Sequence, residues 1–176
     1  EARHSRDLRL REMENVSTAT TTVSGTQSYD LPTGYLEMRY VLYQSDPYNF
    51  LYFMAPPDFF RAFNAGETSG TPKYYTIVGS KIYLGPKPDA AKVLELGFFQ
   101  RPTGLSDSNT TNAVLTDFPD LYLYASLAES APFLVQDERL TVWAQLYKEG
   151  VKTANESAQR GRESSAPLQM STNRVT

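Results

Sequence analysis

The chain has 176 residues, of which 40% are hydrophobic, 21% charged and 12% aromatic, a balance typical of a globular protein. It has no cysteine and a single histidine, His4, which excludes disulfides, thiol nucleophiles and metal sites built on cysteines or paired histidines. The net charge of −3 argues against electrostatic capture of nucleic acid, and no apolar run approaches the ~20 residues of a membrane helix.

Charge and composition divide the sequence into four zones. Residues 1–14 and 15–103 are each neutral, residues 104–158 carry −5, and residues 159–176 carry +2. We predict, in this order, an N-terminal helix, a β-rich insertion, a helical hairpin packing on that helix, and an extended arm. The expected fold class is α+β: a helical core made of the N-terminal helix and a C-terminal αα-hairpin, with an inserted antiparallel β domain and an extended C-terminal arm.

The N-terminal zone lacks glycine, proline and β-branched residues, which favours a helix over 1–14. Its apolar positions are few, so such a helix needs a packing partner or more helix upstream. Because the chain opens at Glu1 without a methionine, we expect this helix to be truncated upstream. Arg3, Arg6 and Arg9 share one face, which is either solvated or contacts an anion or another subunit.

The second zone has the patterns of β-strands. A two-residue loop, Gly79-Ser80, joins two runs of β-branched and aromatic residues and predicts a tight hairpin with positive φ at Gly79. Partial alternation from Leu36 to Tyr43 predicts a half-buried strand with its even-numbered side chains inward. The expected elements are strands over 36–43, 75–78, 81–84 and 93–100 and a short helix over 57–63.

Aromatic residues are concentrated between Tyr35 and Phe63, where they make up 10 of 29 residues. One interpretation is a platform on which sugars or bases stack. Nucleic-acid binding needs interleaved basic residues, and only Arg39 and Arg61 occur here. We therefore favour a packed β core together with a contact surface between subunits.

The third zone predicts two neighbouring helices. Asp117 is a suitable N-cap for the first, Pro132 should end it, and Asp137 should cap the second. The short connection between them predicts an αα-hairpin. Apolar residues recur at helical spacing, and the candidate core anchors are Tyr124, Leu127, Trp143 and Tyr147.

The last zone, residues 159–176, is polar and aperiodic. We expect it to be disordered when isolated and to become ordered on a partner. Its three arginines join those of the first zone as candidate contacts with other subunits or proteins: Arg3, Arg6, Arg9, Arg160, Arg162 and Arg174.

No catalytic motif is present: the sequence has no GxSxG, HExxH, P-loop or GxGxxG. Residues 106–110 resemble half of a calcium loop but lack its central glycine and terminal glutamate. A glycosidase pair among the many carboxylates is not excluded by counting alone. We predict a protein that is not an enzyme, with no catalytic residues, no cofactor and no metal site.

Several segments together resemble the head-to-tail adaptor proteins of tailed bacteriophages, also called connector or head-completion proteins. The resemblance covers roughly residues 1–158, and its ordered series is more specific than any single piece. The segments that carry it are residues 1–14, 30–43, 71–89, 94–109 and 119–147.

This resemblance implies a structural role in the virion, at the interface of head and tail, with assembly in the host cytoplasm. Members form a ring, usually of twelve copies, between the portal protein and the tail or nozzle protein. DNA passes through the channel without specific binding, and the −5 charge of residues 104–158 fits such a conduit. They have no cofactor, no enzymatic activity and no membrane partner.

Two other classes remain open. The first is an aromatic-rich β module of a virion or secreted protein that binds carbohydrate or a surface. The second is an enzyme, a tail-associated glycan hydrolase. Rings in negative-stain images would favour the adaptor, whereas monomers would favour the other two.

Overall fold

The computed structural model describes residues 2–63, 69–130 and 139–163. The chain forms two compact units: Met13–Arg101, which we call the β unit, and Glu1–Glu12 with Pro102–Thr176, which we call the helical unit. The sequence-based boundaries were expected at 14/15 and 103/104, so each lies two residues beyond the structural one.

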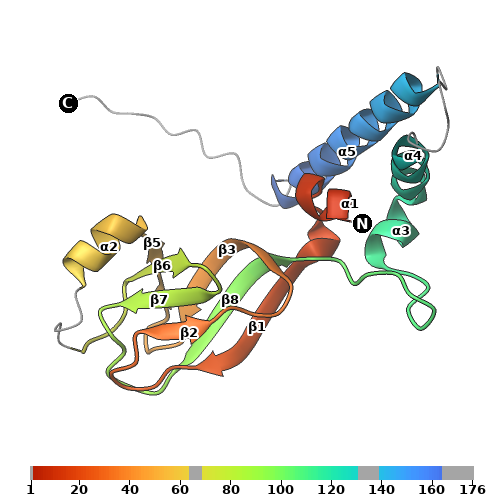
Figure 1. Cartoon of the computed structure of the whole chain (residues 1–176). Helices are drawn as coiled ribbons and strands as arrows, with labels where there is room; N and C mark the ends of the chain where they lie inside the picture. The colour runs from red at the N-terminus through yellow and green to blue at the C-terminus, as the bar shows by residue number, and fades with distance from the viewer. Residues whose placement is uncertain (1, 64–68, 131–138, 164–176) are drawn as a thin grey trace, which may run out of the picture. The chain divides into compact units, whose positions relative to one another are not determined.

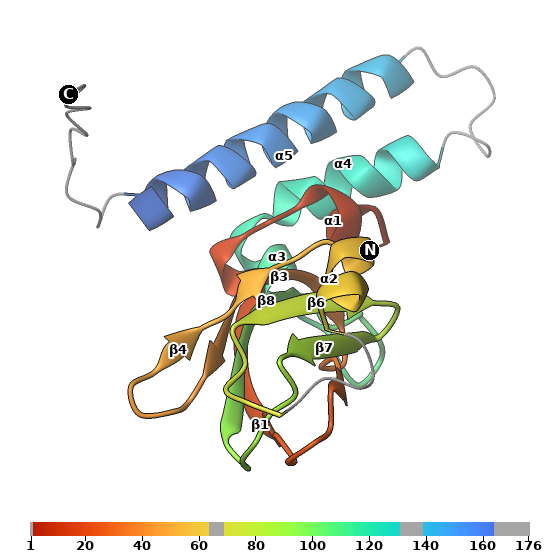
Figure 2. The same ribbon diagram turned by 90° about the vertical axis from the view of Figure 1, so that its left-hand side faces the viewer.

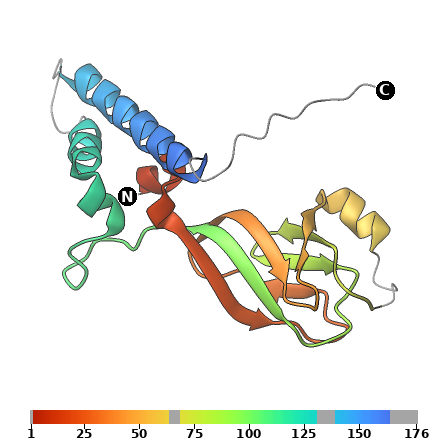
Figure 3. The ribbon, with the colours of Figure 1, turned by 180° about the vertical axis from the view of Figure 1, so that it is seen from behind.

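The β unit consists of two four-stranded sheets (Figures 1 and 3). The first sheet has the order β1 (Glu14–Thr21), β8 (Val93–Gln100), β3 (Tyr35–Tyr43) and β4 (Asn49–Phe50). The second has the order β2 (Ser28–Asp30), β7 (Lys81–Gly85), β6 (Tyr74–Val78) and β5 (Tyr52–Phe53). Neighbouring strands are antiparallel, except that β5 runs parallel to β6, so the second sheet is mixed.

The two sheets pack face to face around one apolar core. Side chains from β3 and β8 of the first sheet meet side chains from β6 and β7 of the second. Leu51, between β4 and β5, is buried in this core, where the chain passes from one sheet to the other. The buried cluster is Val41, Tyr43, Leu51, Tyr75, Ile82, Leu84, Leu94, Leu96 and Phe98.

Local patterns predicted strands β3, β6, β7 and β8 and the short helix of the β unit. The hairpin of β6 and β7 is confirmed, with φ of 62° at Gly79, where glycine avoids the clash of a Cβ. The strand expected over 93–100 matches β8, and the strand over 36–43 begins one residue earlier. The short helix is α2 (Pro56–Ala62), which buries Phe59.

The alternation predicted for β3 is wrong at its C-terminal end. The even-numbered side chains were expected inward, but Val41 and Tyr43 face the core between the sheets. The pairing of β3 with β8 is irregular between Met38 and Tyr40. A bulge of this kind shifts the register by one residue and exchanges the two faces of the strand.

The helical unit contains α1 (Ala2–Asp7), the 3-10 turn η1 (Arg11–Met13), α3 (Ala113–Asp117), α4 (Pro119–Glu129) and α5 (Leu140–Glu163). Helices α4 and α5 run side by side (Figure 2). A Cβ at Gly150 of α5 would lie 2.7 Å from the Leu121 side chain of α4, so glycine permits the close approach. No helix among the described residues is long and apolar enough to cross a membrane.

The predicted fold class, a helical core with an inserted antiparallel β domain, is wrong. The β unit has two sheets, one of them mixed, and its own apolar core, so strands rather than helices dominate the fold. The reason is compositional: large aromatic and branched residues are concentrated in the strands. A pair of helices with few apolar positions cannot supply a comparable core.

Three helix boundaries also differ from expectation. The N-terminal helix ends at Asp7, and residues from Glu14 onward belong to β1. Asp117 ends α3 and does not cap α4, whose N-cap position is Phe118. Asn112 caps α3, and its Oδ1 accepts a hydrogen bond from Leu115 N–H at 2.9 Å. Residues 159–163 continue α5 and are not an extended arm. Pro132, Asp137 and residues 164–176 lie outside the described residues.

Candidate interaction surfaces

An exposed group of aromatic side chains covers β4, β5 and the start of α2. We call it the aromatic surface: Tyr48, Phe50, Tyr52, Phe53 and Phe60, which are 43% to 70% exposed. Leu51 and Phe59 in the same segment are buried, so this segment contributes side chains both to the core and to the surface. Large apolar side chains exposed together are the usual mark of an interaction site.

Ring contacts connect two members of this surface, Tyr52 and Phe60, through Tyr74, Phe63 and the buried Phe59. Tyr52 packs against Tyr74 with ring centroids 6.5 Å apart, and Tyr74 packs against Phe63 at 5.9 Å. Phe63 and Phe60 both contact Phe59, at 5.2 and 5.5 Å. The rings meet edge-on or tilted and do not form the flat platform on which a sugar or base would stack.

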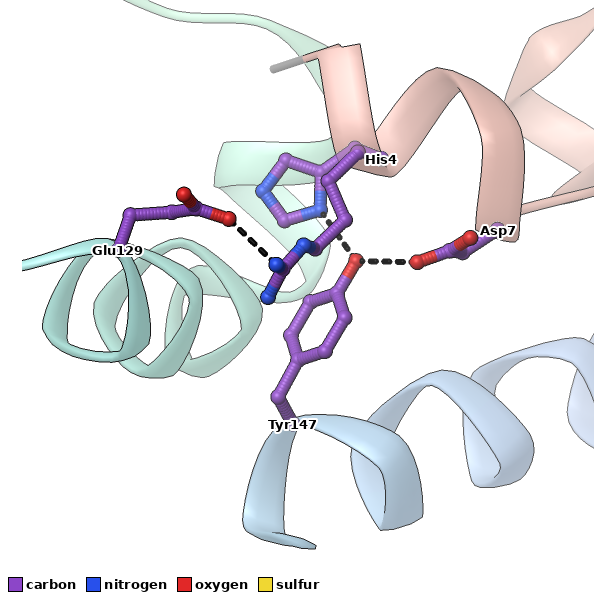
Figure 4. A network of polar contacts seen from close by, with 5 residues as sticks. His4, Asp7, Glu129 and Tyr147 are labelled. Atoms are coloured by element: carbon purple, nitrogen blue, oxygen red, sulfur yellow. Dashed lines mark hydrogen bonds and ion pairs between the residues drawn. The ribbon is translucent and has the colours of Figure 1, made fainter. Parts of the chain in front are cut away.

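In the helical unit, the single histidine lies at the centre of a polar cluster (Figure 4). His4 is 2% exposed and lies between the rings of Tyr122 and Tyr147, with centroids 4.5 and 5.8 Å away. The Tyr147 hydroxyl lies 3.4 Å from His4 Nδ1 and donates to Asp7 Oδ2 at 3.1 Å. This cluster joins α1 to α5 and is closed to solvent at its centre, as expected of a structural element.

Tyr147 carries the strongest electrostatic perturbation in the cluster. Burial raises the pKa of its hydroxyl far above the usual range, and the neighbouring Asp7 carboxylate raises the pKa further. Tyr147 therefore stays protonated and acts as a hydrogen-bond donor, not as a nucleophile or base.

Asn155 on α5 holds the end of α1 in a two-point contact. Its Oδ1 accepts from the backbone N–H of Arg9 at 2.9 Å, and its Nδ2 donates to the carbonyl of Asp7 at 2.9 Å. Sequence analysis missed both this contact and the role of His4. A polar residue at helical spacing after Tyr147 is a weak signal by itself, because its partner lies 146 residues away along the chain.

The candidate contact arginines fall into different environments. Arg3 pairs with Glu129 at 2.5 Å and lies over the Tyr147 ring. Arg9 donates from Nη1 to the carbonyl of Ser5 in α1 at 3.1 Å and to that of Leu8 at 2.7 Å. Arg6 and Arg160 are exposed, and Arg160 lies on α5. Arg162 belongs to α5 as well, and Arg174 lies outside the described residues.

The candidate core anchors differ in burial. Tyr147 is 4% exposed, whereas Trp143, Tyr124 and Leu127 are half-buried. Trp143 has the Arg139 guanidinium 5.3 Å from its ring. On α4 the buried side chains are Leu121 and Ala125, four residues apart on one face.

The described residues hold no cluster of side chains that could bind a metal ion. No group of three or more histidine or acidic side chains lies together in the parts of the chain that the structure describes. The segment resembling half of a calcium loop is closed by its own hydrogen bonds, including Asn109 Nδ2 to the Gly104 carbonyl at 2.8 Å. A groove between η1 and α5 is about 130 Å³, below the roughly 300–1,000 Å³ of small-molecule sites.

Comparison with known proteins agrees with this picture of a structural protein. The family model described as SU10 adaptor protein matches residues 1–171. No curated protein matches the chain. The match spans both units, including the strands that carry the aromatic surface. The chain therefore belongs to the SU10 adaptor protein family, a family of bacteriophage head-tail adaptors that are structural components of the virion.

Proposed function

We propose that the protein forms a ring, of twelve copies, between the portal and the tail or nozzle of a tailed bacteriophage. DNA passes through the central channel of this ring during packaging and ejection. The observation that carries the proposal is the aromatic surface on a chain of this family. Five exposed aromatic side chains within thirteen residues are costly on a free monomer, because they leave large apolar area in water.

The charge of the chain supports passage of DNA without binding. Residues 104–158 carry −5 and the whole chain −3. Tight binding to duplex DNA needs several phosphate contacts from lysine and arginine, and such contacts would retard the moving genome. An acidic wall repels phosphates weakly and leaves the DNA free to slide.

Of the candidate arginines, Arg6 and Arg160 are the best suited to contact the portal or a neighbouring copy. Both side chains are exposed. Arg3 and Arg9 already pair within the helical unit, which leaves their guanidinium groups less available. We propose that Arg162 and Arg174 contribute from the same end of the chain.

The competing function, a carbohydrate-binding β module, also draws on the exposed aromatic residues. Such a site needs hydrogen-bond donors and acceptors converging beside a flat ring. Residues 47–57 contain no charged residue, and the rings of the surface are tilted against their neighbours. A protein contact therefore suits this surface better.

The test is negative-stain imaging and sedimentation of the purified full chain, alone and with portal rings of the same phage. We expect closed rings or a collar on the portal. Particles that stay monomeric under both conditions, together with specific glycan binding, would overturn the adaptor proposal in favour of the β module.

A second measurement tests the conduit. Fluorescence anisotropy with labelled duplex DNA at physiological salt should show no binding below about 100 µM, the weak end of non-specific affinity. Sub-micromolar binding with a steep salt dependence would contradict passage without binding.

A further inference from the structure

The first sheet of the β unit is open at both edges. In the order β1-β8-β3-β4, β1 and β4 each have a single neighbour among the described strands. An edge strand presents backbone groups that can pair with another chain, and proteins usually protect such edges with lysine or proline. Edge strand β1 begins at the charged Glu14, which pairs with Arg39, but residues 15–29 and 48–55 contain neither a charged residue nor a proline.

The outer face of this sheet carries an apolar row that runs from one edge to the other. Val16 on β1 lies opposite Gly97 on β8, and Gly97 lies opposite Tyr40 on β3. The Tyr40 ring covers Gly97, where any Cβ would collide with it. Phe50 on β4 packs edge-on against Tyr40, with ring centroids 6.1 Å apart.

Both ends of the row are left in water. Val16 is 53% exposed and Phe50 is 58% exposed. In the described part of the β unit, the other large apolar side chains that are exposed outside the aromatic surface are Val23, just after β1, and Val78. The two edges of one sheet thus each present apolar groups, and Glu14 on β1 would meet no like charge on residues 48–55.

We propose that β1 of one copy docks beside β4 and β5 of the next copy, so that Val16 meets the aromatic surface at Phe50. The apolar rows of successive copies then join into one. Because the two surfaces differ, the contact is head-to-tail, the type that closes into a ring. This inference rests on the proposed ring and names the surfaces that build it.

The lengths of the edge strands indicate that side chains, more than backbone hydrogen bonds, stabilise this contact. Strands β4 and β5 have two residues each, so backbone pairing along them is short. The pairing of β1 with β8 is irregular between Ser17 and Thr20, which leaves Glu14–Ser17, with Val16, as the regular stretch. Burial of the Val16 and Phe50 side chains, more than the backbone ladder, holds the copies together.

The native chain has no cysteine, so introduced thiols report contacts without background. The experiment uses full-length Val16→Cys and Phe50→Cys variants, mixed under conditions in which the unmodified protein forms rings, and a short thiol-to-thiol crosslinker. We expect covalent dimers from the mixture and none from either variant alone. The double variant should give a ladder of oligomers. The matched control is Val78→Cys mixed with Phe50→Cys, which should not crosslink.

The outcomes separate this inference from the proposed function. Rings without a crosslink between Val16→Cys and Phe50→Cys, or crosslinks from Phe50→Cys alone, overturn the head-to-tail contact and leave the ring standing. An absence of rings under every condition overturns both. As a second measurement, Val16→Lys should weaken self-association by about tenfold or more, because it charges the docked edge, whereas Val78→Lys should leave it unchanged.

Discussion

The β unit and the helical unit reach stability in different ways. The β unit buries nine side chains from two sheets in one apolar cluster. In α5, a helix of 24 residues and about 36 Å, Tyr147 and Ala154 are the buried side chains among those described. The helical unit buries a smaller apolar set, including Leu8, Leu10 and Leu121, and adds a polar cluster around His4 and Asp7. A single chain therefore completes the β core, whereas most of the described side chains of α5 are exposed or half-buried.

Unit-specific probes make this comparison measurable. Trp143 is the single tryptophan and lies in the helical unit, so its fluorescence reports that unit. Two buried tyrosines, Tyr43 and Tyr75, lie in the core of the β unit. Near-ultraviolet circular dichroism of tyrosine therefore reports mainly on the β unit.

The largest effect is expected from Phe98→Ala, which removes a ring from the centre of the β core. We expect a loss of about 3–5 kcal/mol in the unfolding free energy, because the ring is 2% exposed and leaves a cavity. Urea unfolding followed by tyrosine circular dichroism measures it. The Trp143 fluorescence midpoint should move much less; equal shifts of both probes would contradict two separately stabilised units.

In the helical unit, Tyr147→Phe should cost about 1–3 kcal/mol. The substitution keeps the ring between its neighbours but removes the hydroxyl that donates to Asp7 and contacts His4. Trp143 fluorescence during urea unfolding measures the change. Tyr124→Phe, at a half-buried position on α4, is the control and should have a smaller effect.

The same hydroxyl predicts an alkaline dependence. The folded pKa of Tyr147 lies above the ordinary value of 10.0, so above pH 10 the unfolded chain releases a proton that the folded chain retains. Its contribution is therefore fully present below pH 10 and is lost as the pH rises further. The fluorescence midpoint should fall as the pH rises above 10 in the native protein and fall less in Tyr147→Phe. An unchanged slope in the variant would show that another group dominates.

Trp143→Ala tests how far helix burial depends on a partner. Because the side chain is half-buried in the single chain, we expect a loss of about 1–2 kcal/mol, below the cost at a full core position. Thermal unfolding followed at 222 nm gives the value for the monomer. A loss of about 3–5 kcal/mol only in assembled rings would indicate that a neighbouring copy completes the burial.

The smallest effect is expected from single arginine substitutions on portal binding. Arg6→Ala and Arg160→Ala should each weaken co-sedimentation with portal rings by less than about 1 kcal/mol, as exposed ion pairs do. The double variant should show roughly the sum. Lys148→Ala, also exposed on α5, is the matched control. If neither variant nor their combination changes binding, these arginines do not contact the portal.

Local sequence patterns were enough to predict β3, β6, β7, β8 and α2, and the segments along the chain were enough to indicate the family. Gly79-Ser80 between two β-branched runs specified the hairpin, and Pro56 and Pro57 began α2, because turns and helix starts depend on neighbouring residues. The family resemblance rested on segments distributed along the chain, and the match over residues 1–171 confirms it.

Local patterns could not predict which aromatic residues are buried or which unit holds the main core, and both became clear from the tertiary structure. Tyr43 and Phe59 are buried while Phe50 and Phe53 are exposed, although all belong to one aromatic-rich stretch. A bulge in β3 reversed the expected faces, and the partners of His4 and Asp7 lie about 140 residues away in α5. Register and long-range pairing depend on how whole surfaces fit together, which no local pattern records.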